Sequence, residues 1–134
     1  MNILLTGGTG YIGSHTSLVL VREGHNVVLY DNLSNSKNTV NIGLKAITGK
    51  VIPFINGDIR DTEKLIKTLF DYKIEAVVHL AGKKAVNESI KKPIDYYDSN
   101  VVGTISLIKA MQHTNLKNLV FSSSATVYGN PQYL

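Results

Sequence analysis

Short, unbroken apolar runs alternate along the chain with longer stretches in which apolar residues recur at helical spacing. Unbroken runs are typical of strands buried on both faces of a parallel sheet, whereas strands with one wet face alternate apolar and polar residues. The apolar runs predict five strands, at 2–5, 26–30, 51–55, 76–80 and 118–121. The stretches between them predict helices at 11–23, 40–47, 61–70 and 96–113.

This alternation predicts an α/β fold, a doubly wound parallel sheet whose helical crossovers are right-handed. The expected strand order is 3-2-1-4-5, with a ligand crevice where the order reverses between strands 1 and 4. Pro53 has no N–H group to give to a sheet ladder, which predicts an edge position for the third strand. We expect residues 1–134 to form a single, incomplete domain that stops before a sixth strand.

A glycine-rich turn follows the first strand and leads directly into the first helix. Residues 4–13 read LLTGGTGYIG, so Gly8-x-Gly10-x-x-Gly13 and Gly7-x-x-Gly10-x-x-Gly13 both fit this segment. Glycines allow a tight turn and a close approach to a pyrophosphate, and a helix N-terminus offers it unpaired N–H groups. The turn predicts a dinucleotide site, although a glycine cluster by itself can be only a loop.

Carboxylates follow the second and third strands. Asp31 can accept hydrogen bonds from both hydroxyls of an adenosine ribose and would repel a 2′-phosphate, which predicts NAD rather than NADP. Asp58 could reach the adenine through its side chain, while Ile59 offers a backbone N–H group. Asp58 could instead be only the cap of the next helix.

Polar residues also follow the fourth and fifth strands. Lys84, in a loop preceded by glycine, could pair with a phosphate or a nicotinamide ribose, but the residues alone do not decide between Lys83 and Lys84. Residues 122–124 are serines, whose hydroxyls can bond a sugar; no Gly-x-Ser-x-Gly motif surrounds them, which disfavours a serine nucleophile. His79 is interpreted as a structural histidine. No metal-ligand spacing occurs, so we expect no metal site.

Composition and charge restrict the kinds of binding partner that we expect for the chain. The chain has 14 basic and 10 acidic residues, a net charge of +4, scattered without a basic stripe interleaved with aromatic residues. This predicts no nucleic-acid partner and suits an anionic small molecule. Without cysteine there are no disulfides. No apolar run approaches the roughly 20 residues of a membrane span, and the first strand leaves no room for a signal peptide, so we expect a cytoplasmic protein without membrane contact.

Several segments carry a more specific pattern. They are 6–15 (TGGTGYIGSH), 31–36 (DNLSNS), 57–60 (GDIR), 79–86 (HLAGKKAV), 96–98 (YYD), 100–104 (NVVGT) and 121–129 (FSSSATVYG). Together they resemble the UDP-glucose 4-epimerases, which are extended short-chain dehydrogenase/reductases. The resemblance covers the whole chain.

The resemblance implies a tightly held NAD, a UDP-sugar substrate, and 4-epimerisation by transient hydride transfer through a 4-keto sugar. It also implies a homodimer through the helix at 96–113. It assigns cofactor contacts to Gly7, Gly10, Tyr11, Ile12, Gly13, Asp31, Asn32, Leu33, Asn35, Ser36, Asp58, Ile59, Leu80, Ala81, Gly82, Lys84, Ser99, Asn100 and Ser122, and a catalytic role to Ser124.

The sequence departs from the family pattern at two points. Ser99 stands where bacterial members often have an asparagine that contacts the cofactor, and its hydroxyl could make a shorter version of that contact. The catalytic Tyr-x-x-x-Lys motif is absent, because none of the seven tyrosines has a lysine four residues later. We therefore expect the NAD-binding part of an epimerase of galactose metabolism, inactive by itself and homodimeric when complete.

Two alternatives remain open. A nucleotide-sugar dehydratase of the same superfamily would carry an Asp-Glu pair after the serine of the fifth strand, where this chain has 125–127, Ala-Thr-Val. A non-catalytic NAD-sensing module would need no catalytic tyrosine.

Overall fold

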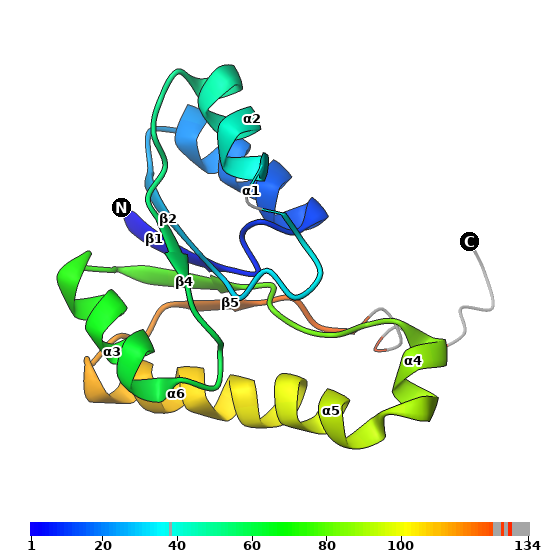
Figure 1. Cartoon of the computed structure of the whole chain (residues 1–134). Coiled ribbons are helices and arrows are strands. Elements are labelled where there is room, and N and C mark those ends of the chain that lie inside the picture. Colours follow the sequence, from blue (N-terminus) through cyan, green and yellow to red (C-terminus); the bar gives the residue numbers. More distant parts are fainter. Residues whose placement is uncertain (38, 125–126, 128, 130–134) are drawn as a thin grey trace.

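The computed structural model describes residues 1–37, 39–124, 127 and 129. Its centre is a parallel sheet of five strands in the order β3-β2-β1-β4-β5 (Figure 1). The strands are β1 (Asn2–Thr6), β2 (Asn26–Asp31), β3 (Phe54–Asn56), β4 (Ala76–His79) and β5 (Leu119–Phe121). The predicted doubly wound α/β fold and its strand order are confirmed.

Helices cover both faces of the sheet. They are α1 (Tyr11–Arg22), α2 (Thr39–Thr48), α3 (Thr62–Asp71), α4 (Val86–Lys91), α5 (Pro93–Tyr97), the π-helical segment η1 (Asp98–Val102) and α6 (Gly103–His113). Helices α1 and α2 lie on one side, and α3 and α6 lie on the other (Figure 1). Within the described residues, no helix is both long and apolar enough to cross a membrane.

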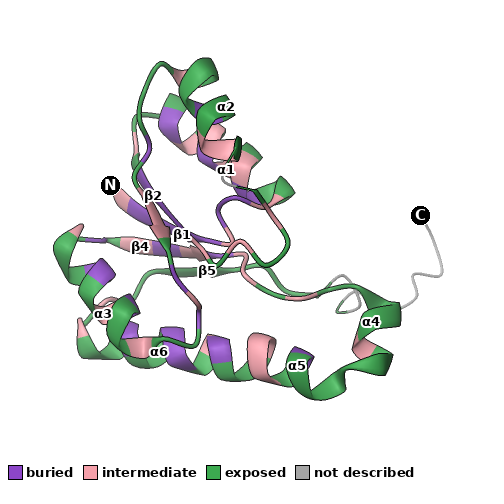
Figure 2. Ribbon diagram, in the orientation of Figure 1, coloured by how far each residue is buried: buried purple, intermediate pink, exposed green. Residues whose placement is uncertain are grey.

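Alternate residues of the central strands feed two separate cores. Leu5 and Leu29 point toward α1 and α2, in a cluster completed by Val21, Val27, Leu44 and Ile52. Their neighbours face α3 and α6, in a cluster that contains Leu4, Val28, Tyr30, Val77, Leu65, Leu69, Leu107 and Met111. Burial is accordingly concentrated on the central strands and the inward sides of the helices (Figure 2). Both faces of the sheet are therefore buried, as the unbroken apolar runs predict.

The third strand is shorter and begins later than predicted. It starts at Phe54, not Val51, and lies at the edge of the sheet as the proline indicates. Pro53 precedes the strand and accepts a hydrogen bond from the Leu29 N–H group at 2.9 Å, the only kind of ladder bond that proline can make.

The predicted helix at 96–113 is part of a longer, segmented one. It begins at Pro93, a favoured first residue for a helix, and passes through the π-helical segment before α6. The short helix α4 was not predicted, because no residue of it is buried and it shows no apolar stripe. It connects the 80–84 loop to α5.

The apolar residues of the predicted helix at 96–113 are only partly buried. The sequence places Val101, Ile105, Ile108 and Met111 or Gln112 on one side of this helix. In the structure Met111 is buried, whereas Val101, Ile105 and Ile108 are about half exposed. The buried side of α6 combines small and large residues: Gly103, Ser106, Leu107, Ala110 and Met111.

Candidate functional site

The carboxyl ends of the strands bring the predicted site residues to one edge of the sheet. Thr6, the last residue of β1, is level with Tyr30 of β2 and His79 of β4. His79 is in turn level with Phe121, so the serines at 122–124 leave from the same edge. Following the strand order, this edge presents in turn Asp58, Asp31, the glycine turn, the 80–84 loop and the serines.

Close packing explains the glycines of the turn. Gly7 has φ +68°, and a Cβ there would lie 2.7 Å from the Ala81 nitrogen and 2.8 Å from the Leu80 carbonyl carbon. A Cβ on Gly13 would lie 2.2 Å from the Gly7 oxygen. The turn is thus pressed between the loop after β4 and the start of α1.

The start of α1 is open to a ligand. Gly10 is its N-cap, and no side chain in the described part of the chain caps the helix. The first-turn N–H groups of Tyr11, Ile12 and Gly13 have no intrahelical acceptor and can bind an anion. Both Tyr11 and Ile12 are exposed, and the Tyr11 ring contacts the His15 ring edge-on at 4.8 Å.

Asp31 ties the glycine turn to the polar loop after β2. Its carboxylate accepts hydrogen bonds from the Thr9 N–H group at 3.2 Å, the Leu33 N–H group at 2.9 Å and the Ser36 hydroxyl at 3.3 Å. Ser36 also bonds the Thr9 hydroxyl at 2.7 Å. Asn35 is exposed beside this loop. The carboxylate is therefore held at the edge in a fixed orientation, with Thr9 in a role that the residues alone did not reveal.

Asp58 is held by Arg60. The Arg60 backbone N–H, Nε and Nη2 donate to its carboxylate at 2.9, 2.8 and 2.7 Å, and Asn32 donates at 3.1 Å. Arg60 also pairs with Asp98 of η1. The hydrogen bonds from Arg60 hold the pKa of the Asp58 carboxyl well below its usual range, so the group stays an acceptor.

The alternative that Asp58 caps the next helix is wrong. The N-cap of α3 is Asp61, whose side chain accepts a hydrogen bond from the Lys64 N–H group at 3.0 Å. Ile59 is buried where η1 meets α6, and a Cβ on Gly103 would lie 2.4 Å from the Ile59 side chain. The Arg60–Asp98 ion pair and the packing of Ile59 on Gly103 therefore hold the Asp58 segment against η1 and α6.

Asn100 fixes the loop after β4. Its side-chain oxygen accepts from the Lys83 N–H group, and its amide nitrogen donates to the Lys83 carbonyl, both at 2.8 Å. The Lys83 ammonium lies 5.7 Å from the centre of the Tyr96 ring. Lys84 is exposed, so Lys83 is the lysine engaged with the helix and Lys84 the one that faces solvent. Gly82 packs beside Asn100.

His79 lies beneath this loop and is buried. Its Nδ1 is 2.6 Å from the Thr6 hydroxyl and its Nε2 is 3.1 Å from the Thr104 hydroxyl. Burial lowers the pKa of His79 from its ordinary value of 6.5 to about 4, so the ring is neutral at physiological pH. It is a structural histidine with both nitrogens satisfied, as predicted.

The remaining predicted residues lie near the same edge of the sheet. Ser99 is half-buried on η1, next to Asn100. Ser122 donates its N–H group to the His79 carbonyl at 3.2 Å, and its side chain is exposed, as is Ser124. The structure therefore brings every predicted cofactor segment to one edge; Thr9, Arg60 and Thr104 join them as supports that sequence reasoning missed.

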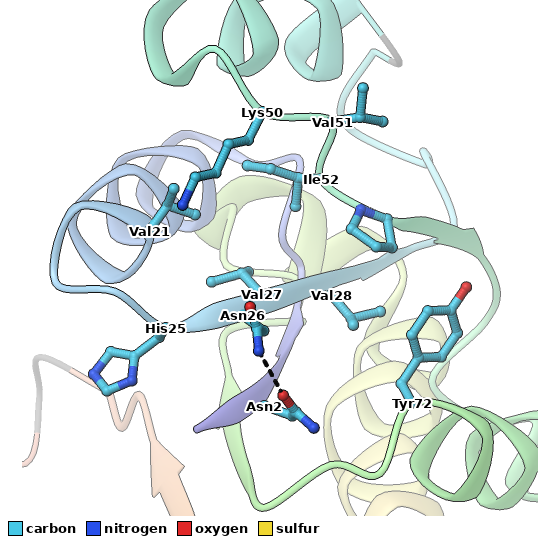
Figure 3. A pocket seen from close by; sticks show the side chains of 11 residues that line it. Asn2, Val21, His25, Asn26, Val27, Val28, Lys50, Val51, Ile52 and Tyr72 are labelled. Atoms are coloured by element: carbon cyan, nitrogen blue, oxygen red, sulfur yellow. Dashed lines mark hydrogen bonds between the residues drawn. The ribbon is translucent and has the colours of Figure 1, made fainter.

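A cavity of about 280 Å³ lies elsewhere, at the opposite edge of the sheet (Figure 3). Asn2 and Asn26, which begin β1 and β2, bond each other at its floor at 2.9 Å. Val27, Ile52 and Pro53 supply apolar walls. None of the predicted site residues lines this cavity, so it is separate from the candidate site.

The sheet order, with the glycine turn at its switch point, places the chain in the Rossmann-like class of α/β proteins. Residues 4–134 match the family model described as GDP-mannose 4,6 dehydratase. A UDP-glucose 4-epimerase of Klebsiella pneumoniae is 52% identical over 130 residues, which are 97% of this chain and 94% of that sequence. The chain belongs to the UDP-glucose 4-epimerase family.

Longer relatives and solved structures agree. A UDP-glucose 4-epimerase of Yersinia enterocolitica is 50% identical over 134 residues, all of this chain and 40% of that protein. The crystal structure of an epimerase from Stenotrophomonas maltophila, with bound NAD and formylated UDP-arabinopyranose, is 47% identical with a TM-score of 0.96 over 99% of this chain and 40% of its own. The Bifidobacterium longum enzyme, in complex with NAD+ and UDP, is 42% identical with a TM-score of 0.94 over 100% of this chain and 40% of its own. The chain spans about 40% of the length of these relatives.

Proposed function

We propose that this chain supplies the NAD-binding region of a UDP-hexose 4-epimerase that interconverts UDP-glucose and UDP-galactose. A bound NAD would supply a hydride acceptor, and then a hydride donor, for C4 of the sugar. The chain's own residues bind the dinucleotide, orient it and contribute a hydroxyl on the sugar side.

The observation that carries this proposal is the order of the polar segments along the sheet edge. The strand order β3-β2-β1-β4-β5 sets Asp58, Asp31, the glycine turn, the 80–84 loop and the serines in a row. An extended dinucleotide presents its adenine, ribose, pyrophosphate and nicotinamide ends in that same sequence, and the sugar follows. Each segment has the chemistry that its expected neighbour requires.

The adenosine end is met by carboxylates. Asp31, fixed by Thr9 and Ser36, accepts hydrogen bonds from ribose hydroxyls and repels a 2′-phosphate. Asp58 accepts from the exocyclic amino group of adenine, since Arg60 keeps it ionised. The pyrophosphate binds the open N–H groups of Tyr11 and Ile12 at the start of α1.

The nicotinamide and sugar ends are met by Lys84 and by the serines. The Lys84 ammonium reaches the nicotinamide ribose, and the Ser124 hydroxyl bonds the reacting sugar oxygen.

A general base typically raises the reaction rate by about a hundred- to ten-thousand-fold. Because no tyrosine here is followed by the required lysine, we expect this chain alone to turn over no substrate.

The exposed apolar side of the long helix supports a homodimer as part of the same proposal. Ile94, Tyr97, Val101, Ile105 and Ile108 all lie outside the two cores of the described residues. A contiguous exposed apolar stripe of this kind marks a protein interface.

The description of the matching family model favours one second candidate, a nucleotide-sugar dehydratase. Its elimination step needs an acid and a base after the serine of β5. Residues 125–127 are Ala-Thr-Val, which supply neither. Formation of a 4-keto-6-deoxy sugar by a longer form of the protein that contains this chain would favour the dehydratase; interconversion of the two UDP-hexoses would favour the epimerase.

Titration of the purified chain with NAD and NADP tests the proposed site. NAD is expected to bind and NADP to bind more weakly, because Asp31 repels the 2′-phosphate. Asp31→Asn should weaken NAD by about tenfold, since it removes the anionic acceptor. The control is Asp71→Asn, which removes an exposed carboxylate that pairs with Lys67 on α3. Equal affinity for the two cofactors, or an equal effect of both substitutions, would contradict the proposal.

A further inference from the structure

The buried His79 ring has a defined tautomer, set by its neighbours. The Thr104 hydroxyl donates its single hydrogen to the Asn100 carbonyl at 2.6 Å, so it can only accept from His79 Nε2 at 3.1 Å. Nε2 therefore carries the ring proton. Nδ1 is then an acceptor, and the Thr6 hydroxyl donates to it at 2.6 Å.

The two residues bonded to this ring are also involved in holding the 80–84 loop. At its near end, the Ala81 N–H group lies 3.4 Å from the Thr6 hydroxyl, and the Leu80 N–H group bonds the Thr6 carbonyl at 3.1 Å. At the far end of the loop, the side-chain amide of Asn100 bonds both the N–H group and the carbonyl of Lys83. The backbone carbonyl of Asn100 accepts the hydrogen bond from the Thr104 hydroxyl. One imidazole thus joins both anchors of the loop.

The ring does more than fill space. An apolar side chain at position 79 would suit a central strand of a buried parallel sheet equally well. It would, however, leave the Thr6 hydroxyl, which is fully buried, without its acceptor, and Thr104 without its donor. The Phe121 ring packs on the imidazole at 5.6 Å between centres and helps to fix its plane.

We propose that His79 is a positioning residue which, by joining Thr6 to Thr104, sets the placement of the 80–84 loop and with it the affinity for the nicotinamide half of the dinucleotide. The adenosine half does not depend on this network, because Asp31 and Asp58 are held by other contacts. The inference rests on the proposed NAD site.

The test compares NAD with ADP, which lacks both the nicotinamide and the ribose attached to it. Both are titrated into the parent chain, Thr104→Val, which removes the hydroxyl while keeping the shape, and Thr104→Ser, which keeps the hydroxyl. Thr104→Val is expected to weaken NAD by about tenfold while leaving ADP within about twofold. Thr104→Ser should restore the parent's NAD affinity. Amide exchange at Ala81 and Lys83 should rise in Thr104→Val and not in Thr104→Ser.

The outcomes separate the two proposals. Equal losses for NAD and ADP, or no loss for either, would overturn the positioning role alone. Failure of the parent chain to bind either ligand would overturn the NAD site, and the inference with it. If Thr104→Val does not fold, His79→Gln and His79→Leu replace the threonine pair. The glutamine keeps one donor and one acceptor and is expected to preserve the preference for NAD over ADP. A preference kept by the leucine variant too would overturn the inference.

Discussion

The two halves of the candidate site are held in place by different physical means. On the adenosine side, the glycine turn is shaped by backbone packing, and Asp31 and Asp58 are held by half-exposed polar contacts. On the nicotinamide side, the 80–84 loop depends on a network of side chains centred on a buried histidine. The glycine turn on the adenosine side is thus constrained by steric exclusion of side chains. The loop on the nicotinamide side is constrained by buried hydrogen bonds.

The two halves also differ in how far apart in the sequence the interacting residues lie. Gly13 is required by its close approach to Gly7 and Gly8, and Asp31 bonds partners no more than 22 positions away, although Gly7 also packs against Leu80 and Ala81. His79 instead bonds residues 73 positions before it and 25 after it. Substitutions in the two halves should consequently fail in different ways: steric in the first, and dependent on pH and hydrogen bonding in the second.

The largest effect is expected at Gly13. Gly13→Ala places a Cβ 2.2 Å from the Gly7 carbonyl oxygen, so α1 must shift away from the turn. Backbone overpacking of this kind costs about 3 kcal/mol of unfolding free energy, which urea denaturation measures. NAD binding should fall as well.

Gly43→Ala in α2 is the matched control, because a Cβ there meets nothing within 4 Å. It should stabilise the chain by up to about 1 kcal/mol through helix propensity. A Gly13→Ala variant as stable as Gly43→Ala would show that the turn tolerates a side chain, and would contradict the steric constraint on the turn.

A smaller effect is expected from the pH dependence of His79. Its pKa is 6.5 in the unfolded chain and about 4 in the folded one, so the unfolded chain binds more protons between these values. The stabilisation is complete above pH 6.5 and is lost as the pH falls toward 4. Between pH 7 and pH 5 this one group should cost about 2 kcal/mol of unfolding free energy.

His79→Gln removes the titration while keeping a donor and an acceptor. Urea unfolding at pH 7 and pH 5 should show a smaller loss of stability in this variant than in the parent, because the substitution removes one titratable group and leaves the others unchanged. Parallel losses in the two proteins would mean that the His79 ring is not kept neutral by burial.

The sequence was most informative where geometry is local. The glycine turn, the acid at the end of β2 and the unbroken strands required no knowledge of the fold, and they predicted the sheet order correctly. The role of Asp58 was ambiguous because its partner Arg60 and the N-cap residue of α3, Asp61, are neighbours in the sequence. The structure was needed to show which aspartate caps the helix.

Helix faces were harder to predict. The apolar residues of the last helix did not by themselves identify its buried side, because Ile105 and Ile108 are about half exposed while Gly103, Ser106 and Ala110 are buried. The network of His79, Thr6 and Thr104 could not be inferred either. Nothing in the spacing of one histidine and two threonines signals that the sheet and a helix bring them together.

The central claim is that the dinucleotide binds along the carboxyl edge of the sheet, and backbone amide NMR during a NAD titration tests it most directly. NAD should shift the amide signals of Tyr11, Ile12, Leu33, Ile59 and the 80–84 loop, with little change at Val27 and Ile52, which line the cavity at the opposite edge. Shifts concentrated around that cavity, with the glycine turn unaffected, would contradict binding at the carboxyl edge.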